Sequence, residues 1–300
     1  MNQPAFALRR VLRRSGPLAA AMAMLLAFGA SGVAASGADK STEVLDAQGI
    51  VHARGQAHVA KPRSSPNLLF HGGQILNGSV VQSIFWGSSW TDSDDKVTGL
   101  DSFYKTVGGS AYMKSNTEYS GTNGSVGTAV SFGGHLLDPS AAPSGAPSTS
   151  AVLAEVAKMI RNPILNGYYP VYIDQPRGNA GYCAWHSYGT VGGVPVQFGF
   201  FFRLDGDAGC DPADTVTGHS QGLAALANVS GHELSETVTD PRNGGWYDRS
   251  GAENSDKCAW TFSGLVTLGG AKWKIQGNWS NAAYNTRSGY DGAGCIETSK

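Results

Sequence analysis

The stretch that most constrains the fold is a mostly apolar run at residues 194–204. A short run of β-branched and aromatic residues favours a strand, and a strand that is apolar throughout is buried on both faces. We therefore predict a central strand in a sheet that other elements cover on each side. Further strands are predicted at 79–87 and 168–174, with a looser pattern at 124–134.

Apolar residues at helical spacing predict three helices. One runs from Asp92 or Ser93 to residue 107, and one covers 151–161 after the capping run 148–150. The third covers 214–239 and ends at Asp240, because the residue before a proline avoids the helical conformation. Strands mixed with helices in one chain predict an α+β (mixed α/β) fold, a single globular domain with a central mixed sheet.

The first 38 residues have the pattern of a secretory signal peptide. Four arginines precede an apolar run at 17–28, which is shorter than the roughly 20 residues of a membrane span, and small residues follow it. We expect a secreted protein, extracellular or periplasmic. Residues 39–66 have little apolar periodicity and are predicted to be a flexible leader or propeptide, and residues 67–300 form the globular domain.

Charge limits the partners. Removing residues 1–38 removes four arginines and no acidic residue, which leaves 18 Lys and Arg against 23 Asp and Glu. A net charge of −5 argues against nucleic acid or an anionic membrane as the partner. We expect a monomer that has no membrane association after signal removal.

Four cysteines, an even number in an exported chain, predict two disulfides. Three pairings are possible. We favour Cys183–Cys210 and Cys258–Cys295, because these pairings keep the closed loops local. The second would pin a C-terminal loop region rich in Gly, Trp and Asn. A zinc site built from all four cysteines is the alternative, but no CxxC pair is present.

The chemistry of the chain centres on an HExxE motif, His232-Glu233-Leu234-Ser235-Glu236, in the third predicted helix. Helical residues four apart share a face, so His232 and Glu236 can bind one divalent metal. Glu233 would then be the general base that takes a proton from a metal-bound water. The alternative is an ordinary solvated helix face. His186 and Tyr247 are possible transition-state donors, although packing roles would also explain them.

Several stretches resemble the EXORDIUM / phosphate-induced protein family, and most closely its bacterial branch. They are His71-Gly72-Gly73, 84–87 with Trp90, 182–186, 239–241 and 245–247. The resemblance spans 67–295. The plant members are linked to the cell wall, which implies an alternative function as a non-catalytic, secreted cell-wall or surface-associated protein, with carbohydrate stacking on the tryptophans at 246, 260, 273 and 279.

A narrower resemblance is to the gluzincin zinc peptidases. Residues 232–240 are similar to their HExxH helix, with Glu236 in place of the second histidine, and 249–256 are similar to their downstream ligand segment. This resemblance implies Glu253 as the third ligand. Asp256 or Asp240 would hold the other ring nitrogen of His232, and Asp240 competes with Glu253 as a ligand because it lies two turns beyond His232.

Together these observations predict a secreted zinc endopeptidase that acts on a polypeptide substrate or on cell-wall material. Two carboxylates and one imidazole make a harder ligand set than two imidazoles and one carboxylate, so Ca²⁺ and Mn²⁺ are alternatives to Zn²⁺. A structural calcium site on the same acids is a further possibility, and it predicts thermal stabilisation by calcium without turnover.

Overall fold

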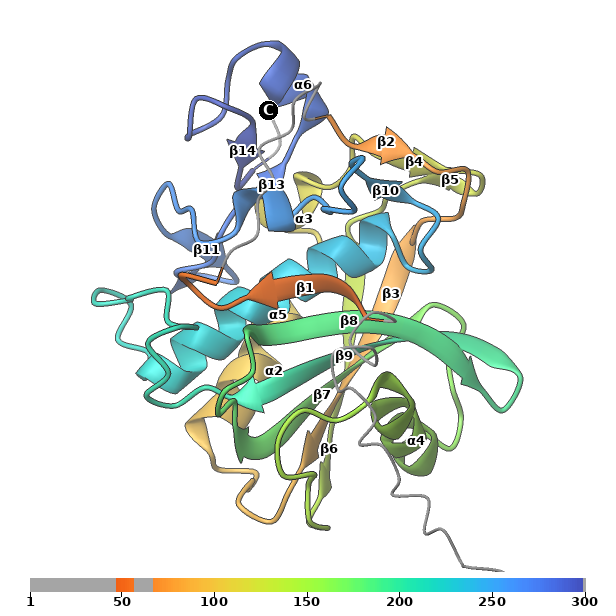
Figure 1. The fold of residues 1–300 in the computed structure, drawn as a ribbon, viewed down its shortest axis with the longest axis vertical. Helices are drawn as coiled ribbons and strands as arrows, with labels where there is room; N and C mark the ends of the chain where they lie inside the picture. The colour runs from red at the N-terminus through yellow and green to blue at the C-terminus, as the bar shows by residue number, and fades with distance from the viewer. Residues whose placement is uncertain (1–46, 57–66, 299–300) are drawn as a thin grey trace, which may run out of the picture. The chain divides into compact units, whose positions relative to one another are not determined.

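The computed structural model describes residues 47–56 and 67–298, all within one compact unit, Asp39–Lys300. The predicted signal peptide at 1–38 lies outside these residues, as do 39–46 and 57–66 of the predicted leader. The fold is a single α+β domain built on a mixed sheet, as the sequence predicts (Figure 1).

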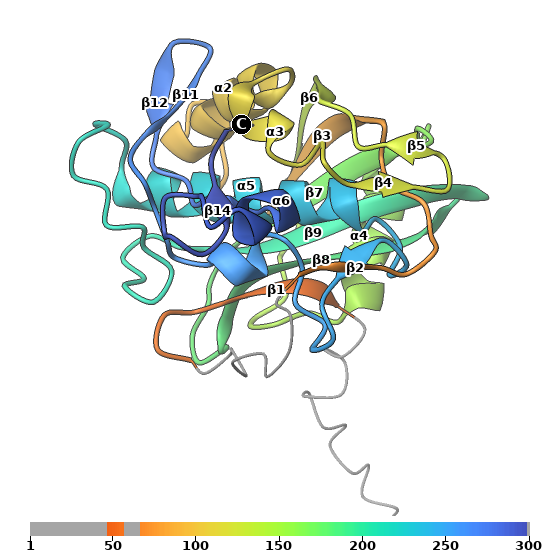
Figure 2. The ribbon, with the colours of Figure 1, turned by 90° about the horizontal axis from the view of Figure 1, so that it is seen from above.

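Six strands form the sheet, in the order β1-β8-β9-β7-β3-β6. Their bounds are β1 Gln48–His52, β3 Gly78–Trp86, β6 Ala129–Asp138, β7 Gly167–Pro176, β8 Tyr182–Val191 and β9 Val194–Arg203. Strands β6, β3, β7 and β9 are parallel to one another, whereas β8 is antiparallel to β9 and β1 is antiparallel to β8. Figure 2 shows β1 along the edge of the sheet beside β8.

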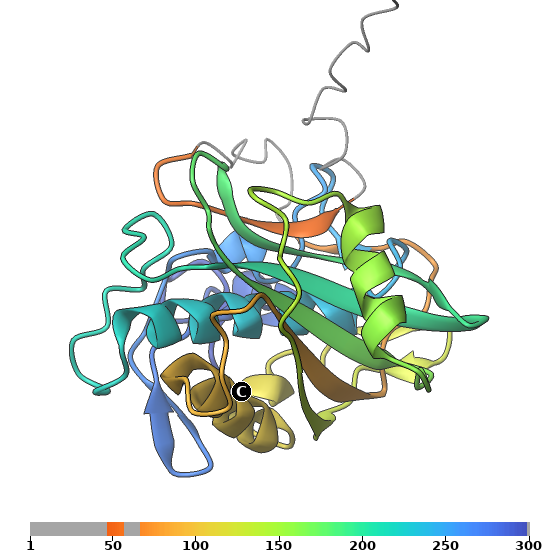
Figure 3. The same ribbon diagram turned by 90° about the horizontal axis from the view of Figure 1, so that it is seen from below.

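The apolar run at 194–204 is the inner strand β9, and its residues 196–202 are buried as predicted. Helices α2 (Asp95–Val107) and α5 (Gln221–Thr239) cover one face of the sheet, and α4 (Thr149–Met159) covers the other (Figure 3). Helix α5 packs against β8, β9 and β1, and α2 packs on α5. This layering explains why β9 is apolar throughout.

Helix α5 starts at Gln221, seven residues later than predicted. Ser220 caps the helix by accepting a hydrogen bond from the Leu223 amide, and the carboxylate of Asp214 accepts from the amides of residues 216 and 217 to make a separate turn. The small apolar residues do form a helix, but the hydrogen bonds of the Asp214 side chain hold the first residues of the predicted range in a turn instead. Helix α2 likewise begins after Asp94 rather than Asp92 or Ser93.

Two strands of the six-stranded sheet were not predicted. Strand β8 contains the segment 182–186, and β1 lies within the predicted leader. Strand β1 has only five residues, too few to give a clear pattern in the sequence. The looser strand predicted at 124–134 is displaced to β6, and a small hairpin of β4 (Ser120–Gly121) and β5 (Gly124–Ser125) precedes it.

The C-terminal region consists of short elements that the predicted disulfides hold. Both predicted pairs form, Cys183–Cys210 and Cys258–Cys295, and they fit an oxidising compartment. Within the described residues, no helix is both long and apolar enough to cross a bilayer. The short elements of this region are β10 Trp246–Tyr247, the 3-10 turn η2 Asp256–Cys258, β11 Val266–Leu268, β12 Ala271–Trp273, β13 Asn278–Trp279, α6 Asn281–Asn285 and β14 Cys295–Ile296. Two more short elements, β2 Leu69–Phe70 and α3 Ala111–Lys114, lie earlier in the chain.

Candidate metal centre

The HExxE motif lies in the C-terminal half of α5, and it is buried rather than solvated. His232, Glu233 and Glu236 each have 0% exposed surface, because the sheet, α2 and the C-terminal region surround the helix. The alternative of an ordinary solvated helix face is therefore wrong. Charged side chains are almost never fully buried without partners, so this cluster requires an explanation.

His232 and Glu236 come together as the helical spacing predicts, and Asp256 joins them from η2. The His232 Nε2 atom lies 3.0 Å from Glu236 Oε1 and 3.5 Å from Asp256 Oδ1. One ligand atom from each of the three residues lies within 4.8 Å of the other two. Ligand atoms about 2 Å from one shared metal ion are spaced in this way.

Glu253, the predicted third ligand, points elsewhere. Its Oε1 atom lies 3.3 Å from His186 Nε2, and Glu253 is not a member of the His232 group. Asp256 takes that place because η2 folds it back toward the helix. The Asp256 amide donates to Glu236 Oε1 at 2.8 Å, and the Asp256 carboxylate accepts from the Glu253 amide at 3.0 Å.

Asp240, the predicted competitor for the third position, shapes the loop after the helix. Its Oδ1 atom accepts from the amides of Gly244 and Gly245, both at 2.7 Å. Asp240 is the C-cap of α5 and is absent from both metal-binding groups found among the described residues. Its role in the structure is that of a loop anchor.

His186, on β8, forms a second group with Glu233 and Glu236. Its Nε2 atom lies 3.9 Å from Glu236 Oε2. Burial, and after it the neighbouring His232, lower the pKa of His186 to about 3. His186 is therefore neutral, and a neutral imidazole has one nitrogen that can donate and one that can accept or bind a metal.

The buried carboxylates lack partners for several oxygens. The Oε2 atoms of Glu236 and Glu253 have no hydrogen-bond partner among the described residues, and the only group placed to donate to the Glu233 carboxylate there is the Val51 backbone amide. Burial raises the pKa of Glu233 and Glu253 well above the ordinary value, and burial with the nearby charge of Asp256 raises that of Glu236 to about 7. Unpaired buried acids at ligand spacing fit a divalent cation, which would supply the missing positive charge.

Gln276 sets the proton position on His232. Its amide nitrogen donates to the Ser255 carbonyl at 2.9 Å and its oxygen accepts from the Trp260 amide at 3.2 Å, so its orientation is fixed. The same nitrogen lies 2.8 Å from His232 Nδ1, which must then accept. The remaining proton is then on Nε2, which lies 3.0 Å from Glu236 Oε1. A cation that binds Nε2 would displace this proton and would require the amide to turn over.

The negative charges around His232 favour a second proton on its ring. Burial lowers the pKa of His232, but Glu236, Asp256 and Glu233 together raise it well above the ordinary value, which favours a ring with two protons. We favour the singly protonated ring in this arrangement, because a proton on Nδ1 would meet the Gln276 amide hydrogens directly.

A network of uncharged side chains, here called the amide network, holds the 253–256 segment against α5. It consists of Asn116, Ser235, Asn254, Ser255 and Asn278, all buried. Asn254 donates to Asn116 at 2.7 Å, Ser255 donates to Asn278 at 2.7 Å, and both Asn116 and Asn278 donate to Ser235 on the helix. No pattern in the sequence indicates this network, because Asn254 and Asn116 lie 138 residues apart.

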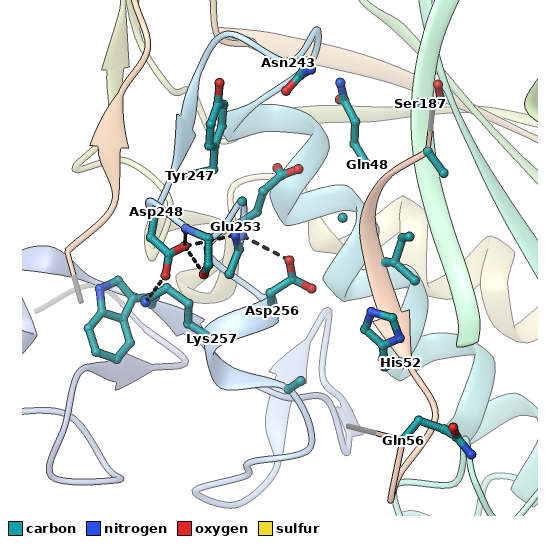
Figure 4. Close-up of a pocket in the computed structure, with 18 of the residues that line it drawn as sticks. Gln48, His52, Gln56, Ser187, Asn243, Tyr247, Asp248, Glu253, Asp256 and Lys257 are labelled. Carbon is teal, nitrogen blue, oxygen red and sulfur yellow. Dashed lines mark hydrogen bonds and ion pairs between the residues drawn. The ribbon is translucent and has the colours of Figure 1, made fainter. Parts of the chain in front are cut away.

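A cleft of about 1320 Å³ opens beside these groups, between β1 and the segment 243–257 (Figure 4). Glu253 and Asp256 line it, and the Asp256 side chain is 20% exposed, whereas His232 and Glu236 lie beneath. Tyr247 also lines the cleft, but its ring stacks on His71 and its hydroxyl points away from Asp256 in Figure 4. Asp256 thus connects the buried group to the cleft.

Gly49 of β1 lies directly against the buried group. A Cβ atom added to Gly49 would lie 1.9 Å from Glu236 Oε2 and 2.5 Å from His186 Nε2. Only a residue without a side chain fits at this position. Gly49 was not predicted to belong to the site, because the sequence shows it as one glycine among 41.

No family model, curated protein or solved structure matches the chain. The resemblances to the EXORDIUM family and to the gluzincins therefore stay predictions. The expectation that four tryptophans are available for sugars is wrong for Trp273 and Trp279, which are 1% and 5% exposed. The Trp273 ring packs against Phe103 and His219, and the Trp279 ring packs against Tyr284.

Proposed function

We propose that the protein is a secreted, metal-dependent hydrolase that cleaves polypeptides, with His232, Glu236 and Asp256 as metal ligands and Glu233 as general base. The observation that carries the proposal is the His–Glu–Asp group at ligand spacing, with His232 and Glu236 fully buried and Asp256 partly exposed, beside the buried carboxylate of Glu233. One imidazole and two carboxylates suit Zn²⁺ or Mn²⁺. The imidazole makes the set a poorer match for Ca²⁺, which binds through oxygen.

Each residue has a distinct task. A divalent cation in this position would polarise a water molecule and the substrate carbonyl. Glu233 would take the proton of the water and deliver it to the leaving amine. His186, neutral and in its Nε2-protonated form, would donate a hydrogen bond to the oxygen that gains charge.

The ligand assignment is tested by metal affinity, measured by competition with a chromogenic chelator on the metal-free protein. Asp256→Asn should weaken binding at least about tenfold, while Glu253→Gln, its matched control three residues away, should change it far less. The reverse order would move the third ligand back to Glu253.

The role of Glu233 is tested by turnover of an unstructured peptide in the presence of Zn²⁺ or Mn²⁺. Glu233→Gln should keep the metal and lower kcat by roughly 10²- to 10⁴-fold. A wild-type protein that binds no metal stoichiometrically, or a Glu233→Gln variant with the wild-type rate, would refute the proposal. Thermal stabilisation by Ca²⁺ without turnover under any metal would instead assign these acids to a structural calcium site.

A further inference from the structure

The proposed catalytic groups are closed off by the chain itself. Glu233, Glu236 and His186 have no exposed surface, although a hydrolase must bring them into contact with its substrate. Strand β1 lies over α5 and beside β8, and Gly49 lies against Glu236 and His186. A substrate cannot reach these groups while β1 is in place.

We infer that residues 47–56 are a built-in occupant of the edge of β8, where an extended polypeptide substrate binds, and that they must leave before the site can work. The inference rests on the proposed hydrolase function and adds to it a substrate-binding edge and a blocked state. The substrate class follows from the edge, because extended peptides bind proteins by adding a strand to an open sheet.

The pairing of β1 is that of an added strand. Among the described strands it pairs with β8 alone, with partners Gln48–His186, Val51–Ala184 and His52–Tyr182 and register shifts between them. Strands β8 and β9, in contrast, pair without interruption from Ala184 to Val191. Without β1, the full edge of β8 next to His186 would be open to another extended chain.

The conformation of Gly49 brings the backbone of β1 into direct contact with Glu236 and His186. Its φ of +48° belongs to the left-handed region, which favours glycine. The virtual Cβ position lies within 2.5 Å of both Glu236 Oε2 and His186 Nε2, so any side chain here would meet both groups. The occupant therefore fills the space directly next to the proposed catalytic residues.

The anchors of the occupant are non-covalent. The Trp260 indole donates to the His52 carbonyl at 2.8 Å, and the Arg54 guanidinium lies 5.1 Å from the centre of the Trp260 ring. The amides of Ala53 and Arg54 donate to the carbonyls of Gly181 and Gly209. Both disulfides join other parts of the chain, so the occupant is held by connectivity and by contacts that can be broken.

Connectivity explains how so short a strand would keep substrate out. A tethered segment has an effective concentration in the millimolar range, so it outcompetes free substrate at micromolar concentration. Cutting the chain between Gln56 and Asn67 would remove this advantage while leaving the metal ligands and α5 intact. The cut chain should then release residues 47–56 and bind an extended peptide in their place.

The experiment inserts the recognition sequence of a site-specific protease between Ala60 and Lys61 of the full chain, with a scrambled insertion as control. Anisotropy of a labelled synthetic peptide spanning residues 47–56, and turnover of an unstructured peptide with Zn²⁺ or Mn²⁺, are measured before and after cutting. The uncut chain should bind no labelled peptide and turn over at least about tenfold more slowly than the cut chain. A peptide with Gly49→Val should fail to bind, whereas Gln56→Ala, a change at the exposed end, should bind normally.

The outcomes separate the two proposals. Peptide binding that appears on cutting, without turnover under any metal, supports the occupant and refutes the hydrolase. Equal turnover before and after cutting supports the hydrolase and refutes the occupant. Normal binding of the Gly49→Val peptide also refutes the occupant. If residues 47–56 stay bound to the cut chain even with Trp260→Phe, which removes the indole bond to His52, β1 is an integral strand and the inference is overturned.

Discussion

Replacing Gly49 by alanine tests the contact between β1 and the proposed site. The new Cβ would lie 1.9 Å from Glu236 Oε2 and 2.4 Å from His186 Cδ2, both fully buried atoms in a packed interior. Such overpacking costs about 1–3 kcal/mol of stability. The left-handed backbone at Gly49 adds about 1 kcal/mol for any residue with a side chain, so the expected total is about 2–4 kcal/mol.

Gly55→Ala is the matched control. Gly55 follows β1 with a φ of +79°, but no atom lies within 4 Å of its virtual Cβ. Alanine there meets only the backbone cost of about 1 kcal/mol. The difference between the two variants therefore isolates the contact of Gly49 with Glu236 and His186, and we expect Gly49→Ala to be less stable by about 1–3 kcal/mol.

The assay is urea unfolding of the metal-free variants at one pH, combined with hydrogen exchange of the β8 amides. If β1 stays docked, the strain appears in the global free energy of unfolding. If β1 detaches instead, the loss of global stability is limited to the docking free energy of β1, and amides of β8 exchange faster. Two variants that agree within about 0.5 kcal/mol and show the same exchange at β8 would refute the contact in solution.

Two further predictions concern other parts of the molecule. Gln276→Glu should tighten Zn²⁺ binding roughly tenfold in a chelator titration. The reason is that a carboxylate at this position accepts a hydrogen bond from His232 Nδ1–H, which leaves Nε2 without a proton and free to bind the metal. Unchanged or weaker binding would contradict the assignment of the His232 proton to Nε2. Burial lowers the pKa of His135, but the hydrogen bonds to Asp92 and Asp101 outweigh it and raise the pKa above its ordinary value. The stabilisation by protonated His135 is therefore complete below pH 6.5 and is lost as the pH rises through the raised pKa. The difference in melting temperature between wild type and His135→Gln should narrow over that range, and a constant difference would argue against the ion pairs of His135 with Asp92 and Asp101.

The parts of the fold that the sequence predicted are those with a local signature. Three such patterns each lie within one helix or strand. They are the apolar run of β9, the small apolar residues of α5, and the spacing of His232 and Glu236. The disulfides were predicted because short loops limit the choice of pairing. Local patterns carry this information because neighbours along a helix or strand keep a fixed geometry in any fold.

The rest depends on contacts between distant residues or on single turns. Glu253 and Asp256 are both acids in one short segment, and only the 3-10 turn η2 decides that Asp256 points toward His232. His186 reaches the site because β8 packs against α5, a contact between elements that the sequence pattern does not connect. The role of Gly49 follows only from its contacts with Glu236 and His186 in the folded structure.

The amide network has a consequence for the behaviour of the site under changing conditions. Its five members, Asn116, Ser235, Asn254, Ser255 and Asn278, carry no group that titrates near neutral pH. The acids that they position gain and lose protons, and a cation that enters or leaves changes the local charge by two. Neutral amides and hydroxyls hold the 253–256 segment beside α5 in every charge state, whereas the hydrogen bonds to Glu236 and to the Asp256 carboxylate change with it. Part of the support of the site is thus independent of the charge that the site carries.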